Sequence, residues 1–302
     1  MGVQNQTHRH WELVIVDDGS TDHTAMLAQE QAQRDSRMRV FRQPNGGVSA
    51  ARNYGFAQTG QTSEYVIFLD ADDVWQPNAL ETLIAALQAS PQAVAAHGAA
   101  RFMDDKGMPI RPGEHEAYAL RRCAVSEGKL TLLPETAPTT FAALAYRNCV
   151  PSGGILLRRE AKEQAGAFNP ALSPAEDWDM WLRMSLLGEI AFVPQIVYCY
   201  RQHGSGASQN MAAMRQAEER VRESLLARLD NSQRQAALSA FAFDRQTLCR
   251  ELIRGAVSLL RQGRLRQAAG TFRQAAQANA QRRRWAALAR SYHSVLRTKG
   301  IF

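Results

Sequence analysis

Acidic side chains cluster at two places where the sequence predicts that a buried strand ends. They are Asp17 and Asp18 in the first cluster and Asp70, Asp72 and Asp73 in the second. Neighbouring strands of one sheet would bring both clusters to the same edge, where their charges repel unless a cation lies between them. Mg²⁺ typically binds one or two carboxylates together with phosphate oxygens. Either cluster alone is equally typical of turns and helix caps, but the pair favours a divalent cation, Mn²⁺ or Mg²⁺, bound to a diphosphate.

The segments that must position these side chains alternate between short apolar runs and helical patterns. This alternation is typical of an open α/β sheet with parallel strands, whose ligands lie at the carboxyl ends of the strands. The expected strands are 11–16, 39–42, 65–69, 154–157 and 190–197, and the expected helices are 22–33, 49–58, 77–89 and 175–187. Residues 93–145 look less regular, and we interpret them as an insertion that selects the acceptor.

Five segments resemble, in order and in spacing, the signature motifs of family 2 glycosyltransferases. They are ELVIVDDGSTD (12–22), NGGVSAARNYG (45–55), LDADD (69–73), EDWDMWLR (176–183) and YRQHGS (200–205). The resemblance covers about residues 3–208. It implies a GT-A fold, which is a Rossmann-like mixed sheet flanked by helices, and a metal-dependent, inverting, hexosyltransferase-type enzyme that uses a nucleotide sugar.

The resemblance also assigns roles to individual residues. It implies that Asp17, with Asp18 close by, reads the base, that Arg52 approaches the nucleotide, that Asp70 contacts the ribose, that Asp72 binds the metal with Asp73 in support, and that His203 contacts metal or diphosphate. Arginine suits such a position because its guanidinium stacks on bases and forks onto phosphate. A helix-surface arginine and a polar loop histidine are the alternatives for Arg52 and His203.

Asp177 is the candidate catalytic base. Substitution with inversion needs a carboxylate that takes the proton of the acceptor hydroxyl, and the acidic motif carries that base in the family. Glu176 and Asp179 are competitors for the role. Acidic residues in the first turn are also favourable for the helix dipole alone, so a structural role stays open.

A weaker set of residues belongs to the acceptor or sugar side of the site. It comprises Glu176, Trp178, Gly153 and Gly154. Aromatic rings are good apolar platforms for a sugar, but Trp178 and Trp181 are at least as typical of core packing. Paired glycines would let the backbone approach a ligand closely.

Charge divides the 302-residue chain into two parts. The formal net charge is +7, of which residues 210–302 hold 18 basic and 6 acidic side chains, giving +12, and residues 1–209 carry −5. We therefore expect a glycosyltransferase domain in 1–209 and a basic α-helical extension in 210–302. Four widely separated cysteines favour a reducing cytoplasm, and no apolar run is long enough to cross a bilayer.

The extension contains an amphipathic stripe and a helical hairpin that resembles a single tetratricopeptide-type unit. One such unit cannot bury its own apolar face, so it packs either on the main domain or on a second subunit in a homodimer. Its charge suits an anionic membrane surface, where a lipid-linked acceptor would be met, or serves solubility alone. Few aromatic residues are interleaved with the basic ones, which argues against nucleic acid.

Family members begin with an apolar strand, and residues 3–7 already resemble the end of the helix that follows it. We therefore expect the first strand to be absent and an apolar sheet edge to be open. This expectation supports an alternative in which the chain is a non-catalytic scaffold or binding module. A dehydrogenase is disfavoured because no GxGxxG follows the first predicted strand. For the enzyme we expect a UDP-sugar donor, a glycan or lipid-linked acceptor and a role in bacterial surface polysaccharide synthesis, peripheral to the inner face of the membrane.

Overall fold

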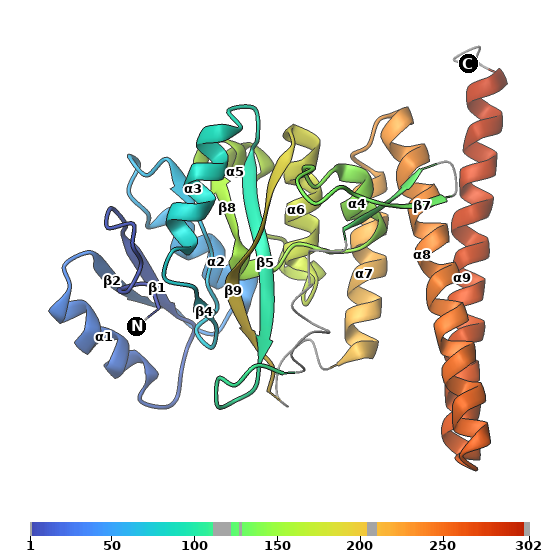
Figure 1. Cartoon of the computed structure of the whole chain (residues 1–302), viewed down its shortest axis with the longest axis horizontal. Coiled ribbons are helices and arrows are strands. Elements are labelled where there is room, and N and C mark those ends of the chain that lie inside the picture. The colour runs from blue at the N-terminus through green and yellow to red at the C-terminus, as the bar shows by residue number, and fades with distance from the viewer. Residues whose placement is uncertain (1, 111–121, 127–128, 204–209, 299–302) are drawn as a thin grey trace. The chain divides into compact units, whose positions relative to one another are not determined.

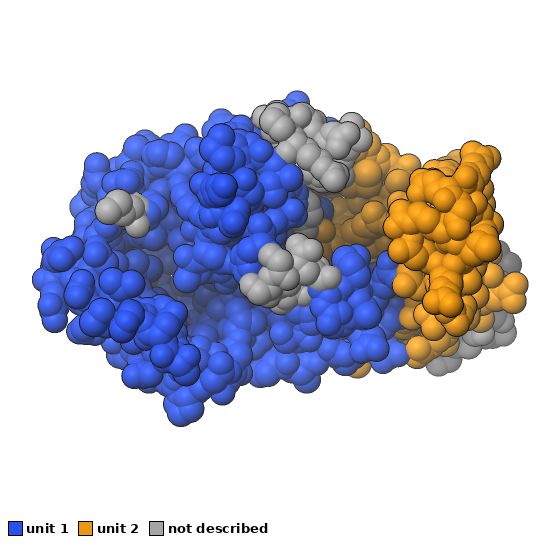
Figure 2. All heavy atoms as spheres, turned by 90° about the horizontal axis from the view of Figure 1, so that it is seen from below, with its two compact units in different colours: residues 1–121, 134–141, 149–223 blue, residues 122–133, 142–148, 224–302 orange. Residues whose placement is uncertain are grey.

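The structure is a computed structural model, and it describes residues 2–110, 122–126, 129–203 and 210–298. The chain divides into two compact units, which are coloured separately in Figure 2. Unit 1 comprises residues 1–121, 134–141 and 149–223, and unit 2 comprises residues 122–133, 142–148 and 224–302. The chain therefore passes between the units several times.

Unit 1 begins with a strand–helix–strand–helix segment, and its first strand ends at the first acidic cluster. The elements are β1 (Leu13–Asp17), α1 (Thr24–Arg34), β2 (Met38–Arg42) and α2 (Val48–Ala57). β1 and β2 pair in parallel from Leu13–Met38 to Asp17–Arg42. Asp17 consequently lies at the carboxyl end of its strand, as the sequence predicts.

A separate five-stranded sheet carries the rest of unit 1, in the order β3-β8-β5-β9-β4 (Figure 1). Its strands are β3 (Tyr65–Val66), β4 (Val74–Trp75), β5 (Ala95–Met103), β8 (Ile155–Arg158) and β9 (Ile190–Arg201). β5 and β9 run parallel, whereas the other neighbours are antiparallel. The mixed sheet implied by the resemblance is confirmed, and the all-parallel sheet predicted from the alternation of elements is wrong.

Helices pack on this sheet and fix the segments that carry the acidic motifs. α3 (Ala79–Ala89) buries Leu83 and Leu87 against β5, β8 and β9. Further along the chain, α5 (Arg159–Ala165) precedes α6 (Glu176–Leu187), which is buried along most of its length. α3 and α6 lie close to the predicted ranges 77–89 and 175–187, whereas the sequence analysis predicted no helix at α5.

The irregular segment predicted for 93–145 is wrong in its first part, where β5 runs for nine residues. β5 has the sequence AAHGAARFM and is buried at most positions. Its small side chains lack the β-branched signature of a strand, and it is held by pairing with β8 on one side and β9 on the other. Residues 111–121 and 127–128 of the predicted insertion lie outside the described residues.

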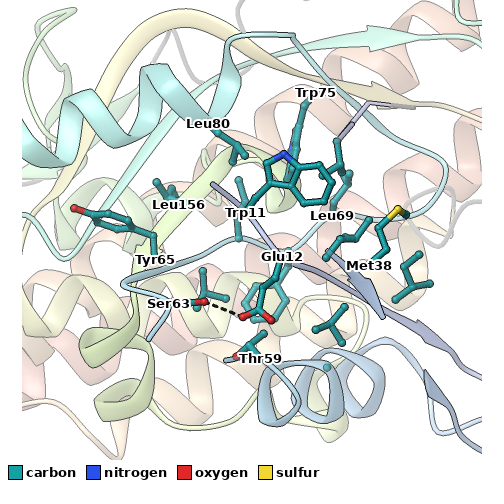
Figure 3. Close-up of a pocket in the computed structure, with 18 of the residues that line it drawn as sticks. Trp11, Glu12, Met38, Thr59, Ser63, Tyr65, Leu69, Trp75, Leu80 and Leu156 are labelled. Atoms are coloured by element: carbon teal, nitrogen blue, oxygen red, sulfur yellow. Dashed lines mark hydrogen bonds between the residues drawn. The ribbon is translucent and has the colours of Figure 1, made fainter. Parts of the chain in front are cut away.

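A cavity of about 1410 Å³ separates β1 from the segment that ends in the second acidic cluster. Among the described strands β1 pairs only with β2, and β3 pairs only with β8, so each has one unpaired edge. Figure 3 shows Trp11, Leu69, Leu80 and Leu156 around this cavity, with Glu12 bonded to Ser63 at its wall. The cavity lies where we expected an open apolar edge.

Unit 2 is built mainly from two long helices, α8 (Asn231–Arg261) and α9 (Leu265–Thr298), joined by a short turn. A hairpin of β6 (Cys123–Ser126) and β7 (Lys129–Leu132) and the end of α4 (Phe141–Tyr146) pack near the first half of α8. There Arg147 forms an ion pair of 2.9 Å with Asp244. The predicted C-terminal helical region is confirmed. Within the described part of the chain, no helix has the length and apolar character needed to span a membrane.

Candidate active site

The first acidic cluster is tied into the backbone that surrounds it. Asp17 is buried and accepts a hydrogen bond from the Ser20 amide at 3.0 Å, and its other oxygen lies 3.0 Å from the Arg42 guanidinium. Asp18 accepts hydrogen bonds from the Gln43 side chain at 2.7 Å and from the Gly46 and Gly47 amides at 2.8 Å. Asp17 therefore ties the turn after β1 to the end of β2, and Asp18 shapes the loop between β2 and α2.

Asp18 also fixes the start of α2. Gly47 precedes the helix with φ of 81°, a left-handed conformation that favours glycine. A carboxylate at a helix N-terminus is favourable because of the helix dipole. Burial alone would raise the pKa of Asp18, but the three hydrogen bonds hold that pKa below its ordinary value. The loop thereby sets the position of Arg52, one turn into α2.

Arg52 joins the second acidic cluster to the acidic motif at the start of α6. Its guanidinium contacts the Asp70 carboxylate at 2.8 and 3.1 Å and the Glu176 carboxylate at 3.0 Å. The Arg52 side chain is 9% exposed. Arg52, Asp70 and Asp73 also line the cavity beside β1. Arg52 thus connects Asp70, predicted for the nucleotide, with Glu176, a competitor for the role of base.

Asp177 lies next to Glu176 in the first turn of α6 and is half-buried. Its Oδ1 accepts a hydrogen bond from the Trp178 amide at 2.6 Å. Burial, followed by the charge of Glu176, raises the pKa of Asp177 to about 7, although Arg52 opposes the shift. A carboxylate with a pKa near neutrality is matched to the work of a general base.

The two competing carboxylates are held in ion pairs. Glu176 is buried and bound to Arg52. Asp179 is 1% exposed and lies 2.7 Å from the Arg183 guanidinium, which also donates to the carbonyl groups of Ala165 and Ala167. Of the three acidic residues in the motif, Asp177 is the most accessible.

Asp72 and His203 meet although they are 131 residues apart. The His203 Nε2 lies 2.8 Å from the Asp72 Oδ2, and both side chains are partly exposed. The two residues predicted as metal contacts are therefore adjacent. Gly204 and Ser205 of the same motif lie outside the described residues.

Asp73 has a different environment from Asp72. It is buried, its Oδ2 accepts a hydrogen bond from the Tyr198 hydroxyl, and its Oδ1 accepts one from the Arg201 amide at 2.7 Å. Burial, together with the charges of Asp72 and Asp70, raises the pKa of Asp73 to about 6 despite these hydrogen bonds. Asp73 thus attaches the end of β9, which leads to His203, to the second acidic cluster.

The residues predicted for the acceptor side lie in packed surroundings. A Cβ at Gly153 would lie 2.3 Å from the Tyr198 ring, and one at Gly154 would lie 2.8 Å from Pro151. Trp178 is 2% exposed and lies beneath the Arg222 guanidinium. The core-packing alternative for this tryptophan therefore agrees with its place in the structure.

Two residues of the site, Tyr198 and Asn53, escaped the sequence analysis, whereas Arg201 lies in the recognised YRQHGS motif. Tyr198 and Arg201 hold the second cluster from β9, and the Arg201 guanidinium donates to the Asp72 carbonyl at 2.7 Å. Asn53 makes a pair of hydrogen bonds with the Phe168 backbone at 2.8 and 2.9 Å. Asn53 lies inside a recognised motif, next to Arg52, and that position was a signal. Nothing in the local sequence marks Tyr198.

A divalent cation at this site would need several oxygen or nitrogen ligands close together. Among the described residues, no group of three or more His, Cys, Asp and Glu side chains is arranged to hold a metal ion. Asp72 and His203 supply one oxygen and one nitrogen within reach of a shared ion. Because Mg²⁺ and similar ions complete their coordination with water and substrate phosphate, two protein ligands fit such an ion.

Comparisons with known sequences point to one family. Residues 2–148 match the sequence model described as Glycosyl transferase family 2. An uncharacterized glycosyltransferase of Nostoc is 30% identical over 72% of this chain and 63% of its own length. The O-antigen biosynthesis protein RfbC of Myxococcus xanthus is 29% identical over 70% of this chain and 15% of its own length. The chain thus spans less than two thirds of these relatives.

Solved structures show the same fold. GalNAc-T7 with UDP, GalNAc and Mn²⁺ has a TM-score of 0.55, with 19% identity over 74% of this chain and 44% of that one. The mannosyltransferase PcManGT of Pyrobaculum calidifontis, in complex with GDP-Man and Mn²⁺, has a TM-score of 0.52, with 18% identity over 92% of this chain and 81% of that one. At this identity the likeness shows the fold alone.

Proposed function

The chain carries a glycosyl transferase family 2 domain, and on this premise we propose that it transfers a sugar from a nucleotide-diphosphate donor to an acceptor hydroxyl with inversion at the anomeric carbon. The observation that carries the proposal is the Arg52 bridge. Arg52 binds Asp70 at 2.8 Å and Glu176 at 3.0 Å, so donor-side and base-side carboxylates share one site.

In the proposed reaction Asp177 accepts the proton of the acceptor hydroxyl. The acceptor oxygen forms a bond to the anomeric carbon, and the bond from that carbon to the diphosphate oxygen breaks. The nucleoside diphosphate leaves with the bonding electrons, and the configuration inverts because attack and departure occur on opposite faces. A base of this kind contributes typically 10²- to 10⁴-fold to the rate.

Asp72 and His203 would hold a divalent cation at the diphosphate. Such a cation supplies Lewis acidity and neutralises charge on the departing group. Asp73, Tyr198 and Arg201 keep the two ligands adjacent through their hydrogen bonds. Two structural neighbours, GalNAc-T7 and PcManGT, hold Mn²⁺, which supports a divalent cation for this chain without selecting Mn²⁺ over Mg²⁺.

The donor base and the acceptor rest on weaker support. The two structural neighbours are named with UDP and with GDP-Man, so the fold accommodates either nucleotide, and we favour a UDP-sugar from the resemblance. The name of the Myxococcus relative supports an acceptor in bacterial surface polysaccharide synthesis. We place the base near Asp17 and Asp18 and the ribose near Asp70.

Calorimetric titration of UDP and GDP in the presence of Mn²⁺ tests the nucleotide site. We expect binding to the full chain that weakens at least tenfold in Asp72→Asn and in His203→Ala. Glu30→Gln, an exposed carboxylate on α1, is the matched control and should leave the affinity unchanged. A folded protein that binds neither nucleotide would exclude the assignment.

Transfer itself is tested with a panel of sugar nucleotides and release of nucleoside diphosphate as the readout. Asp177→Asn should lower kcat at least about 100-fold. The same variant should still bind Mn²⁺ and nucleotide. Equal and low rates in both proteins, with nucleotide binding intact, would favour the non-catalytic binding module instead.

A further inference from the structure

The far half of the α8–α9 hairpin has an unusual distribution of charge. Residues 252–280, on either side of the turn that joins the two helices, contain five arginines and neither Asp nor Glu. All five arginines lie on exposed positions, and they are Arg254, Arg261, Arg264, Arg266 and Arg273. This part of unit 2 therefore carries a dense positive charge with no internal counter-charge.

The same part of the hairpin has its small apolar residues inside and its large ones outside. Alanines fill the contact between the helices, and Ala256, Ala268 and Ala275 are buried. Leu260 is 43% exposed, and Leu265 is 66% exposed. Ile253, Val257 and Phe272 are also exposed. A packed hairpin gains nothing from this arrangement, so the large side chains are available to another surface.

Helix geometry places these side chains on one face. Val257 follows the buried Ala256 by one position, which is about 100° around α8, and Phe272 follows the buried Ala268 by four positions, about 40° in the same sense. The helices are antiparallel (Figure 1). In two antiparallel helices, rotation in the same sense away from a shared seam brings both stripes to the same side of the hairpin.

Arginines border this apolar strip on both sides. Arg254 and Arg261 lie farther around α8 from the seam, and Arg266 and Arg273 lie farther around α9, each by about 140–160° from a buried alanine. The opposite face presents Gly255, Gln267 and Gln274, the residues that directly precede the buried alanines. The hairpin is thus amphipathic as a whole.

We propose that this face, defined by Ile253, Val257, Leu260, Leu265 and Phe272 with the four bordering arginines, binds the surface of an anionic lipid bilayer. Apolar side chains enter the headgroup boundary, and the arginines pair with lipid phosphates, as in interfacial helices. Nucleic acid would use the arginines but not the apolar strip. All these residues belong to unit 2, so the proposal is independent of the proposed catalytic role.

Vesicle flotation of the full chain tests the proposal. We expect the protein to float with phosphatidylcholine vesicles that contain phosphatidylglycerol and to remain at the bottom with phosphatidylcholine alone. The double variant Arg261→Gln/Arg266→Gln should lower the partition coefficient by roughly tenfold or more, since each basic residue near an anionic surface contributes several-fold. Higher salt should weaken the binding further.

A matched control separates the face from net charge. Arg34→Gln/Lys106→Gln removes the same charge from exposed positions of unit 1 and should float like the unchanged protein. Leu260→Gln/Leu265→Gln keeps the charge and should lose the binding that persists at high salt. Circular dichroism and calorimetry with UDP and Mn²⁺ confirm that each variant remains folded and that a loss belongs to the hairpin.

Four outcomes would overturn the proposal. The first is flotation that does not depend on phosphatidylglycerol, and the second is an equal loss in the unit 1 control. The third is a dimer, seen by sedimentation, that Leu260→Gln/Leu265→Gln dissociates while flotation is unchanged, because a second copy would then be the occupant. Tighter binding to duplex DNA than to anionic vesicles at the same salt would likewise assign the face to nucleic acid.

Discussion

Arg52 determines how much negative charge surrounds Asp177. It pairs with Asp70 and Glu176, and its attraction partly offsets the burial and the Glu176 charge that raise the pKa of Asp177 to about 7. In the proposed reaction Asp177 can act as a base only when it is unprotonated. The value of kcat/KM should therefore fall about tenfold per pH unit below this pKa.

Replacing Arg52 by glutamine should move this acid limb to higher pH. Without the guanidinium the pKa of Asp177 rises further, because the charged carboxylate loses a favourable neighbour. The measurement is the pH profile of kcat/KM for nucleoside diphosphate release. Arg42→Gln, which removes the exposed partner of Asp17, should leave the limb in place. An unshifted limb in Arg52→Gln would show that Asp177 is not the titrating base.

Asp73 gives a second pH-dependent prediction, concerned with stability. Its pKa is raised from 3.8 to about 6 in the folded chain, so the folded state binds this proton more tightly than the unfolded state does. The contribution of Asp73 to stability is thus greatest below the unfolded pKa and is lost as pH rises through the folded pKa. Between about pH 4 and pH 7, Asp73→Asn should gain up to about 3 kcal/mol relative to the unchanged protein.

Chemical denaturation at several pH values measures this difference. Asp105→Asn, which replaces an exposed aspartate, serves as the control and should show no such trend. A constant difference across the pH range would mean that Asp73 is ionised as easily in the folded chain as in the unfolded one.

Residue identities at the site were more predictable than their partners. Asp72, His203 and Asp177 stand in motifs whose order and spacing point to one site, and the structure places His203 beside Asp72. Whether a carboxylate binds a ligand or a distant side chain is not encoded locally, and Glu176 pairs with Arg52 across 124 residues. Asp179 instead pairs with the buried Arg183 one turn along the same helix, a spacing that the sequence itself shows.

Among the elements, β9 connects the core of the sheet to Asp73 and to the pair formed by Asp72 and His203. Gly153 packs against Tyr198 so closely that an added Cβ would lie 2.3 Å from the ring. Tyr198 in turn holds Asp73. Gly153→Ala should destabilise the fold by about 1–3 kcal/mol through overpacking and should also weaken binding of Mn²⁺ with UDP.

Gly255→Ala is the matched control for this substitution. It lies within α8, where an added Cβ meets nothing within 4 Å, and should stabilise the chain by up to about 1 kcal/mol. Urea denaturation and calorimetry measure both effects. If Gly153→Ala leaves stability and ligand binding unchanged, Tyr198 does not transmit core packing to the site.

Elements with a clear apolar period were predictable, and those held by neighbours were not. α3 buries one apolar stripe and α6 is buried on most sides, and both are visible in the sequence as helical segments rich in apolar residues. β5 is alanine-rich and exists because β8 and β9 flank it. Of the predicted strand 65–69 only Tyr65–Val66 is paired, because no described strand occupies its other edge.

For the whole molecule, the change in charge near residue 210 is a poor guide to where the chain can be cut. Val221 and Leu225 of α7 (Met211–Leu226) are buried, and Arg222 covers Trp178. In unit 2, Phe243 of α8 packs on Tyr146. Removing residues 210–302 would expose apolar surface in both units.

We therefore expect a fragment of residues 1–209 to aggregate, whereas the full chain stays monodisperse. Size-exclusion chromatography with light scattering measures this directly. A fragment ending at residue 250, which keeps Phe243, should behave better than the shorter one. A soluble 1–209 fragment with a cooperative melting transition would show that the acidic part folds on its own.

The hollow between β1 and the strand that leads to Asp70 also has a practical consequence for anyone who measures melting of this protein. This cavity of about 1410 Å³, lined by Trp11, Leu69 and Leu80, can bind environment-sensitive dyes in the native state. Fluorescence of anilinonaphthalene sulfonate should thus be high before heating begins, imitating a molten globule. Near-ultraviolet circular dichroism, which follows the aromatic rings themselves, is the sounder reporter of unfolding here.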